Sequence, residues 1–173
     1  LGVQSVCSPL YSADSETHDA VVGVPGHWEQ VVAGLDTAFA LGLEVHVHTL
    51  AMVRTLSHLP ALGRWVQSRW GTTVLVAPMR PKEDVFRFKT AAASLDSIRL
   101  IQEPSLQWTG FPECVQPSGT GALLTRLYFR GQKTEHLSTC EGCSLVHTCE
   151  GVVSGYVSEF GPTLAATELT PRP

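Results

Sequence analysis

The stretch Leu43-Glu-Val-His-Val-His-Thr-Leu50 decides the fold class of this chain. Its odd-numbered residues are apolar or threonine, and Glu44, His46 and His48 stand between them. This period of two is typical of a β-strand whose two faces meet different surroundings. We expect Val45 and Val47 to pack beneath helices and the two histidines to lie on the inner, concave side of a parallel sheet.

Helices are predicted on both sides of this strand along the sequence. Residues 27–41 repeat apolar residues with a helical period, and Gly42 is suited to follow the helix end. Its predicted apolar stripe is Trp28, Val31, Val32, Leu35 and Phe39. Ser57 is expected to cap a second helix, with Pro60 in its first turn. The stripe of that helix is Leu59, Leu62, Val66 and Trp70. A weaker helical pattern covers residues 90–101.

Two further apolar runs predict strands at residues 3–7 and 73–77, the second ended by Pro78, and the polar residues 11–25 predict a long loop. Strands separated by helices indicate a parallel sheet with crossover helices. Three such units are too few for a closed eight-fold barrel. The predicted fold is therefore α/β, a partial parallel (β/α) barrel followed by a small irregular cysteine-rich metal-binding segment.

The sequence changes character in its last third. Residues 111–121 are rich in proline and glycine, residues 123–129 are a strand candidate, and residues 139–151 are cysteine-rich and irregular. A short segment with little apolar material needs a further source of stability, which a metal can supply. The expected domains are a partial barrel over 1–110, a cysteine-rich segment over 111–162 and a loose tail over 163–173.

Composition excludes several classes of protein. The chain has 173 residues and a net charge of −4, and no basic run that could follow a phosphate backbone, so we expect no nucleic-acid partner. No apolar stretch is long enough to cross a membrane, and no secretory signal precedes the first strand. A start at Leu1 beside an apolar run suggests a fragment of a longer protein. The expected location is the cytoplasm, where thiols stay reduced.

Three of the five cysteines form the pattern Cys140-x2-Cys143-x5-Cys149. The first two sulfurs of such a pattern can converge on one ion or cluster while the backbone turns. Tetrahedral zinc and a cubane cluster both need a fourth ligand. Cys114, flanked by Pro112 and Pro117 in an expected extended loop, is the first candidate.

His147 is the rival fourth ligand and would favour zinc. A buried apolar role for these cysteines would leave their spacing unexplained. Cys7, in an apolar strand, is expected to be plain core. Spacing alone leaves two kinds of site open, a zinc ion and an iron–sulfur cluster, for which four ligands indicate the 4Fe-4S type.

The order of motifs resembles the C-terminal part of the radical SAM superfamily. The segment around His18-Asp19, with Gly23-Val-Pro-Gly26 leading into a helix, is similar to a loop after a mid-barrel strand of those enzymes. Residues 41–50 are similar to the next strand, and Leu59-Pro60 to the start of the next helix. Cys114, Cys140-Glu-Gly-Cys143 and Cys149-Glu-Gly151, with Tyr156 and Gly161 beyond, are similar to the auxiliary SPASM or twitch segment.

This resemblance implies an iron–sulfur enzyme whose auxiliary cluster is held by Cys114, Cys140, Cys143 and Cys149. It also implies that His46 and His48 face the S-adenosylmethionine and substrate lumen in the full-length parent. The chain departs from the family because it has no Cys-x3-Cys-x2-Cys motif, and Val153 stands where the fuller auxiliary pattern has another cysteine. We therefore expect this chain alone to be inactive toward S-adenosylmethionine.

Three other functions stay open at this point. The chain could be a non-catalytic barrel-like partner of a catalytic subunit, or a zinc-stabilised binding module. His46 and His48 as a His-x-His pair are also typical of metal-dependent hydrolases, with His58, His136 and His147 as further ligands. The expected partners are a small-molecule or peptide substrate and an N-terminal or catalytic partner subunit.

Overall fold

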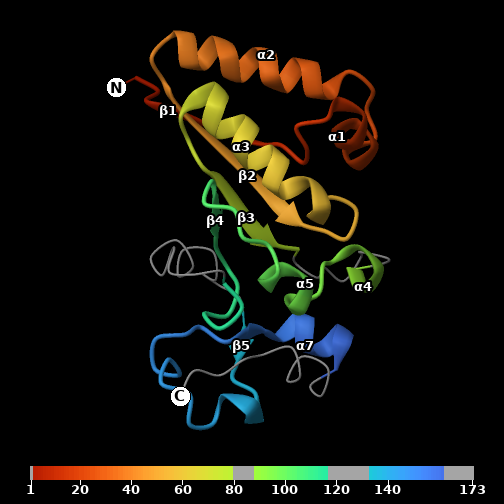
Figure 1. Cartoon of the computed structure of the whole chain (residues 1–173), viewed down its shortest axis with the longest axis vertical. Helices are drawn as coiled ribbons and strands as arrows, with labels where there is room; N and C mark the ends of the chain where they lie inside the picture. The colour runs from red at the N-terminus through yellow and green to blue at the C-terminus, as the bar shows by residue number, and fades with distance from the viewer. Residues whose placement is uncertain (1, 80–87, 117–132, 162–173) are drawn as a thin grey trace. The chain divides into compact units, whose positions relative to one another are not determined.

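The computed structural model describes residues 2–79, 88–116 and 133–161 of the chain. Its larger sheet is parallel, with strand order β1-β2-β3-β4, and helices connect consecutive strands (Figure 1). The strands are β1 (Ser5–Pro9), β2 (Glu44–Ala51), β3 (Val74–Pro78) and β4 (Leu106–Trp108). The α/β class predicted from the sequence is confirmed, and within the described residues these four strands form an open sheet.

Each strand of the sheet follows from a short apolar run. The predicted strands at residues 3–7, 43–50 and 73–77 are each found within two residues of their expected bounds. β1 and β2 pair in register, so that Cys7 lies opposite His46 and Pro9 opposite His48. Val45 and Val47 are buried, whereas His46 is exposed. The predicted alternation of faces along β2 is thus present.

The loop expected at residues 11–25 is wrong in its centre, where α1 (Ser15–Val22) forms. Asp14 caps this helix by accepting a hydrogen bond from the Thr17 N–H at 2.7 Å, and the cap holds the pKa of its carboxyl below the usual value. Gly23 follows the helix end with φ of 79°, a conformation that glycine adopts at little cost.

The two predicted helices beside β2 are present as α2 (His27–Ala40) and α3 (Leu59–Trp70). All four residues of the expected α3 stripe are buried. In α2, Val32 and Leu35 are buried as predicted, but at the end of the stripe Ala38 is buried and Phe39 is 49% exposed. Ser57 lies in a short 3-10 turn (η1, Leu56–His58) and does not cap α3.

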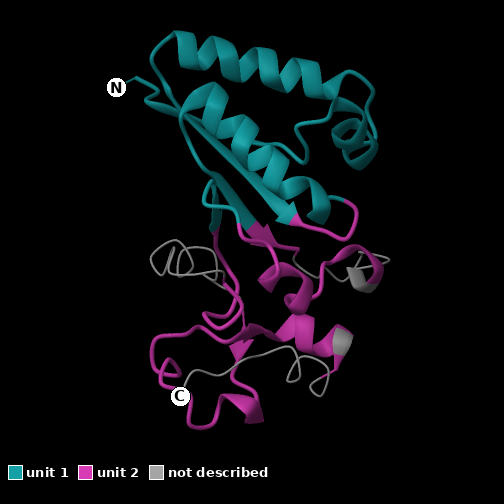
Figure 2. Ribbon diagram, in the orientation of Figure 1, with its two compact units in different colours: residues 1–50, 55–76, 103–107 teal, residues 51–54, 77–102, 108–173 magenta. Residues whose placement is uncertain are grey.

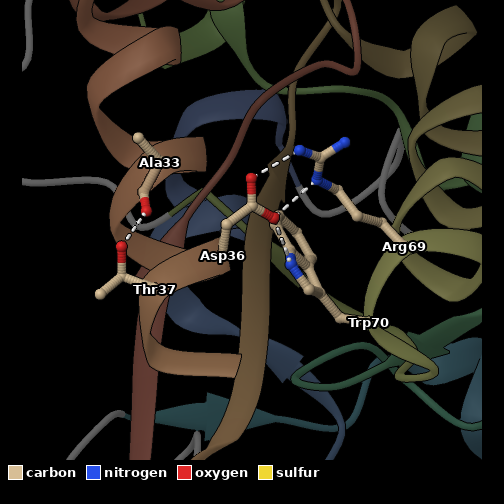
Figure 3. A network of polar contacts seen from close by, with 5 residues as sticks. All are labelled: Ala33, Asp36, Thr37, Arg69 and Trp70. Carbon is tan, nitrogen blue, oxygen red and sulfur yellow. Dashed lines mark hydrogen bonds and ion pairs between the residues drawn. The ribbon is translucent and has the colours of Figure 1, made fainter. Parts of the chain in front are cut away.

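Helices α2 and α3 are joined by the carboxylate of Asp36. It accepts hydrogen bonds from Arg69 Nε at 2.8 Å and Nη2 at 2.5 Å, and from Trp70 Nε1 at 3.0 Å (Figure 3). The Arg69 hydrogen bond lowers the pKa of Asp36. Trp65 lies between Trp28 and Trp70, so aromatic rings continue the contact between the helices.

The expected helix over residues 90–101 is broken in two. α4 (Phe88–Ala91) ends before Ser94, whose extended backbone and side chain cap α5 (Leu95–Arg99). Further along, β5 (Thr134–Glu135) pairs antiparallel with β6 (Val152–Val153), and α7 (Ser154–Phe160) follows. A 3-10 turn, η2 (Ser138–Cys140), opens the cysteine-rich segment. The expected strand at 123–129 and the tail at 163–173 lie outside the described residues.

The chain divides into two compact units, drawn in different colours in Figure 2. Unit 1 comprises residues 1–50, 55–76 and 103–107, and its core is the helix-covered side of the sheet. Unit 2 comprises residues 51–54, 77–102 and 108–173 and contains four of the five cysteines. None of the helices described is long and apolar enough to cross a membrane.

Candidate metal centre

Four cysteines line one cavity in unit 2. They are Cys114, Cys140, Cys143 and Cys149, the four thiols predicted as metal ligands. All five cysteines of the chain are described, and none forms a disulfide. Most of the remaining wall is apolar, formed by Pro112, Leu145, Val146 and Val152, with Glu113, His136 and Gly151. The fold therefore brings together thiols from segments that lie 26 or more residues apart in the sequence, in a cavity with a mostly apolar wall.

A tight turn brings Cys140 and Cys143 to the cavity. The Cys143 N–H donates to the Cys140 carbonyl at 3.1 Å, which closes a four-residue turn. Glu141 has φ −61° and ψ 125°, and Gly142 has φ 78°, the dihedral angles of a type II turn. Only glycine, or less often asparagine, suits the third position of that turn. The sequence Cys-Glu-Gly-Cys thus specifies its own geometry.

The Cys149 sulfur accepts two backbone hydrogen bonds. The donors are the Glu113 N–H at 3.5 Å and the Gly151 N–H at 3.4 Å. Burial raises the pKa of the Cys149 thiol, and the two N–H donors partly oppose that rise. Without a cation nearby, this sulfur stays protonated. A bound metal would displace the proton, and the two N–H dipoles would then stabilise the thiolate.

The antiparallel pairing of β5 with β6 brings together the two ends of the cysteine-rich segment. Glu135 is opposite Val152, and the Ser154 N–H donates to the Lys133 carbonyl at 2.9 Å. His136 follows β5 directly, and its Nε2 lies 2.9 Å from the Cys149 carbonyl oxygen. This backbone contact orients the imidazole at the cavity wall. Residues 136–151 therefore form a loop whose two ends are held together.

Cys114 lies in a turn and not in the extended loop that its flanking prolines suggested. The Val115 N–H donates to the Pro112 carbonyl at 2.9 Å, and the Gln116 N–H reaches the same oxygen at 3.3 Å. The turn nevertheless places Cys114 in the cavity wall. His147, the rival fourth ligand, is exposed and is absent from the cavity lining. The histidine at the cavity is His136 instead.

The separation of the thiols bears on the kind of metal group they suit. Within the part of the chain that the structure describes, no three side chains of ligand type are close enough to hold a single ion. The same holds for the histidines proposed as hydrolase ligands. A tetrahedral zinc site would need sulfurs roughly 3.8 Å apart, from zinc–sulfur bonds of about 2.3 Å. Within the described residues the four cysteines line one cavity without forming such a site.

His46 and His48 lie in unit 1, on the polar face of β2. His46 Nε2 is 3.5 Å from the Glu44 carboxylate, and its side chain is 53% exposed. His48 is half-buried, and burial lowers the pKa of its imidazole. His48 Nδ1 lies 3.5 Å from the Sγ of Cys7. Cys7 is exposed, so the prediction that it belongs to the core is wrong. His58 instead contacts Ser12, with its Nδ1 3.4 Å from the Ser12 Oγ.

Comparison with models of protein families, with curated proteins and with solved structures finds no match to this chain.

Proposed function

We propose that Cys114, Cys140, Cys143 and Cys149 bind an iron–sulfur cluster, and that the chain is the C-terminal portion of a radical SAM enzyme. The cluster would be auxiliary, because the motif that binds S-adenosylmethionine is not present in this sequence. The observation that carries the proposal is the single cavity lined by all four predicted thiols. The family assignment is supported by the order of motifs and by a parallel sheet with sequential strands.

The donor set and its surroundings suit a cluster. Four cysteine thiolates complete the coordination of a 4Fe-4S cluster. The apolar wall limits water, and the N–H donors at Cys149 supply the sulfur hydrogen bonds that tune the reduction potential of such clusters. When bound, the cluster would supply electron transfer.

The chain's own residues would hold the cluster and set its surroundings. The type II turn at Cys140 and the β5–β6 pair position the ligands, and Leu145 and Val146 exclude water. In unit 1, His46 and His48 would contribute to the face that meets S-adenosylmethionine and a small-molecule or peptide substrate. A partner subunit or the preceding part of the protein would supply the missing Cys-x3-Cys-x2-Cys motif, in the cytoplasm.

Metal analysis of protein prepared without oxygen tests the cluster. We expect iron and acid-labile sulfide in equal amounts, about four of each per chain for a 4Fe-4S cluster, with broad visible absorption. The Cys143→Ser and Cys149→Ser variants should lose most of the iron. The matched control is Cys7→Ser, because Cys7 lies in unit 1 and outside the cavity. Stoichiometric zinc without sulfide would refute the cluster and support the zinc-stabilised module.

Two measurements test the assignment to a radical SAM enzyme. The reconstituted chain, reduced with dithionite beside S-adenosylmethionine, should form no more 5′-deoxyadenosine than a protein-free control, because four thiolates leave no iron open to the substrate. Catalytic turnover by the chain would contradict this. The coding sequence upstream should contain an in-frame Cys-x3-Cys-x2-Cys motif. A complete upstream sequence without it would favour the non-catalytic partner.

A further inference from the structure

A thiol and an imidazole lie side by side on the polar face of the sheet in unit 1. The parallel register sets Cys7 opposite His46, two residues from Pro9, which lies opposite His48. Cys7 and the two histidines share one face, since the buried Val45 and Val47 occupy the other. Cys7 Sγ is 3.5 Å from His48 Nδ1, a distance suited to a hydrogen bond that involves sulfur.

His48 is suited to accept a proton at this position. Burial lowers the pKa of its imidazole, so the ring is neutral near pH 7 and its Nδ1 can accept the thiol hydrogen. His46, the neighbouring histidine on the same face, lies beside the Glu44 carboxylate instead. The two histidines therefore differ in their contacts, and the thiol lies against only one of them.

Exposure separates Cys7 from the other four thiols. Cys7 is exposed to solvent, whereas the four cavity cysteines are partly buried and would be held by the metal. Reactive cysteines are accessible and have a base or positive charge nearby. Cys7 meets both conditions, and neither depends on the metal centre of unit 2.

We infer that Cys7, with His48 as its base, is a nucleophilic thiol that forms mixed disulfides with small-molecule disulfides. The Cys7 proton passes to His48 Nδ1, and the thiolate sulfur attacks one sulfur of the disulfide. A new sulfur–sulfur bond forms as the old one breaks. The departing sulfur keeps the electron pair of the broken bond and takes the proton from the imidazolium. Cys7 is oxidised to the mixed disulfide, and half of the small molecule is reduced to its thiol.

The size of the effect follows from the thiolate fraction. An unassisted cysteine is only a few per cent thiolate at pH 7, so proton transfer to a base can raise the reactive fraction by at most about thirty-fold. Because burial disfavours the charged form of the His48 ring, the gain stays below that limit. A thiolate stabilised by an imidazolium is a weaker nucleophile, which offsets part of this gain. We therefore expect the pair to react about ten-fold faster than an ordinary exposed cysteine.

The test measures the rate at which oxidised glutathione modifies each cysteine of the full, metal-loaded chain at pH 7, by peptide mass spectrometry. Cys7 should react about ten-fold faster than a synthetic peptide of residues 4–10. His48→Gln should remove most of that advantage, and added free imidazole should restore part of it in His48→Ala. The matched control His46→Gln should change the rate less than two-fold.

Circular dichroism of each variant establishes that the sheet is intact, and the comparison of the unaltered chain with the peptide needs no variant. A Cys7 rate equal to that of the peptide would overturn the inference. An unchanged rate in a folded His48→Gln variant would do the same. If metal analysis finds no iron–sulfur cluster in unit 2 but Cys7 is still modified fast, the proposed function is refuted and this inference stands.

Discussion

Replacing Gly151 by alanine tests whether the cysteine-rich loop depends on its closed base. Gly151 has φ of +80°, and a Cβ added there would lie 2.5 Å from the Glu135 carbonyl oxygen and 3.0 Å from its carbon. Both neighbours are backbone atoms of β5, so no flexible side chain can move aside. The Gly151 N–H is also a donor to Cys149 Sγ. Relief of the clash would therefore shift β5, the sulfur hydrogen bond, or both.

The cost can be separated into two parts. An L-residue in the left-handed region costs about 1–2 kcal/mol, and forcing an extra carbon into a packed site costs about 1–3 kcal/mol more. Gly151→Ala should then lower the free energy of unfolding by about 2–5 kcal/mol. Gly142→Ala is the matched control, because Gly142 has φ of +78° and nothing within 4 Å of an added Cβ. It should cost only the first part, about 1–2 kcal/mol.

Hydrogen exchange of the amides in residues 133–153 is the assay, since it follows this segment whether or not a metal is bound. Protection factors should fall roughly ten-fold more in Gly151→Ala than in Gly142→Ala, because 1.4 kcal/mol corresponds to a factor of ten. The Gly151→Ala variant should also retain less iron than the Gly142→Ala variant. Equal protection in the two variants would refute the reasoning, since it would mean that the approach of Glu135 to Gly151 carries no energetic consequence.

Three further predictions concern unit 1. Gly63→Ala should lower the free energy of unfolding by about 1–2 kcal/mol, measured by urea titration, because the added Cβ would lie 2.9 Å from Leu106 Cδ2. Gly34 has open space around it, so Gly34→Ala should instead stabilise α2 by about 0.5–1 kcal/mol. Equal effects of the two substitutions would contradict this reasoning. Burial lowers the pKa of His18, so the unfolded state takes up a proton first as the pH falls below about 6.5. Stability should therefore be full above that pH and fall toward pH 5, with a smaller slope in His18→Gln; a flat profile would count against the buried neutral ring. Asp36→Asn should lower the free energy of unfolding by about 1 kcal/mol, measured by the urea midpoint, because it weakens the paired hydrogen bonds with the Arg69 guanidinium; no change would show that the exposed pair contributes nothing.

The regular parts of unit 1 could be predicted because their patterns are strong. The alternation around Val45 and Val47 and the stripe from Leu59 to Trp70 each bury one face, and both are present. Helix α1 was missed because only one of its eight residues, His18, is buried, so it has no apolar stripe to detect. The local signal was Asp14 as an N-terminal cap with Gly23 after the last turn.

Sequence spacing predicts the geometry of the cysteine site only where the cysteines are close together in the chain. The Cys140 turn follows from its own four residues, whereas Cys114 enters the cavity through a turn that its prolines did not indicate. His136 has no spacing signal, because the β5–β6 pair brings it to the cavity. The Cys7–His48 contact spans 41 residues and depends on the strand order and register of β1 and β2. The period of two predicts on which face of the sheet each side chain lies. Which residue lies beside it on the next strand depends on how the strands pair, and periodicity does not predict that.

The energetics of residues 133–153 connect the metal to the fold of this segment. Its regular structure consists of two strands of two residues each and one 3-10 turn, and its buried apolar side chains are Leu137 and Val152. So small an apolar core contributes little stability, and the proposed metal–thiolate bonds would add to it, since ligand binding of this kind is itself folding free energy. Removal of the metal should consequently loosen the same amides that Gly151→Ala exposes.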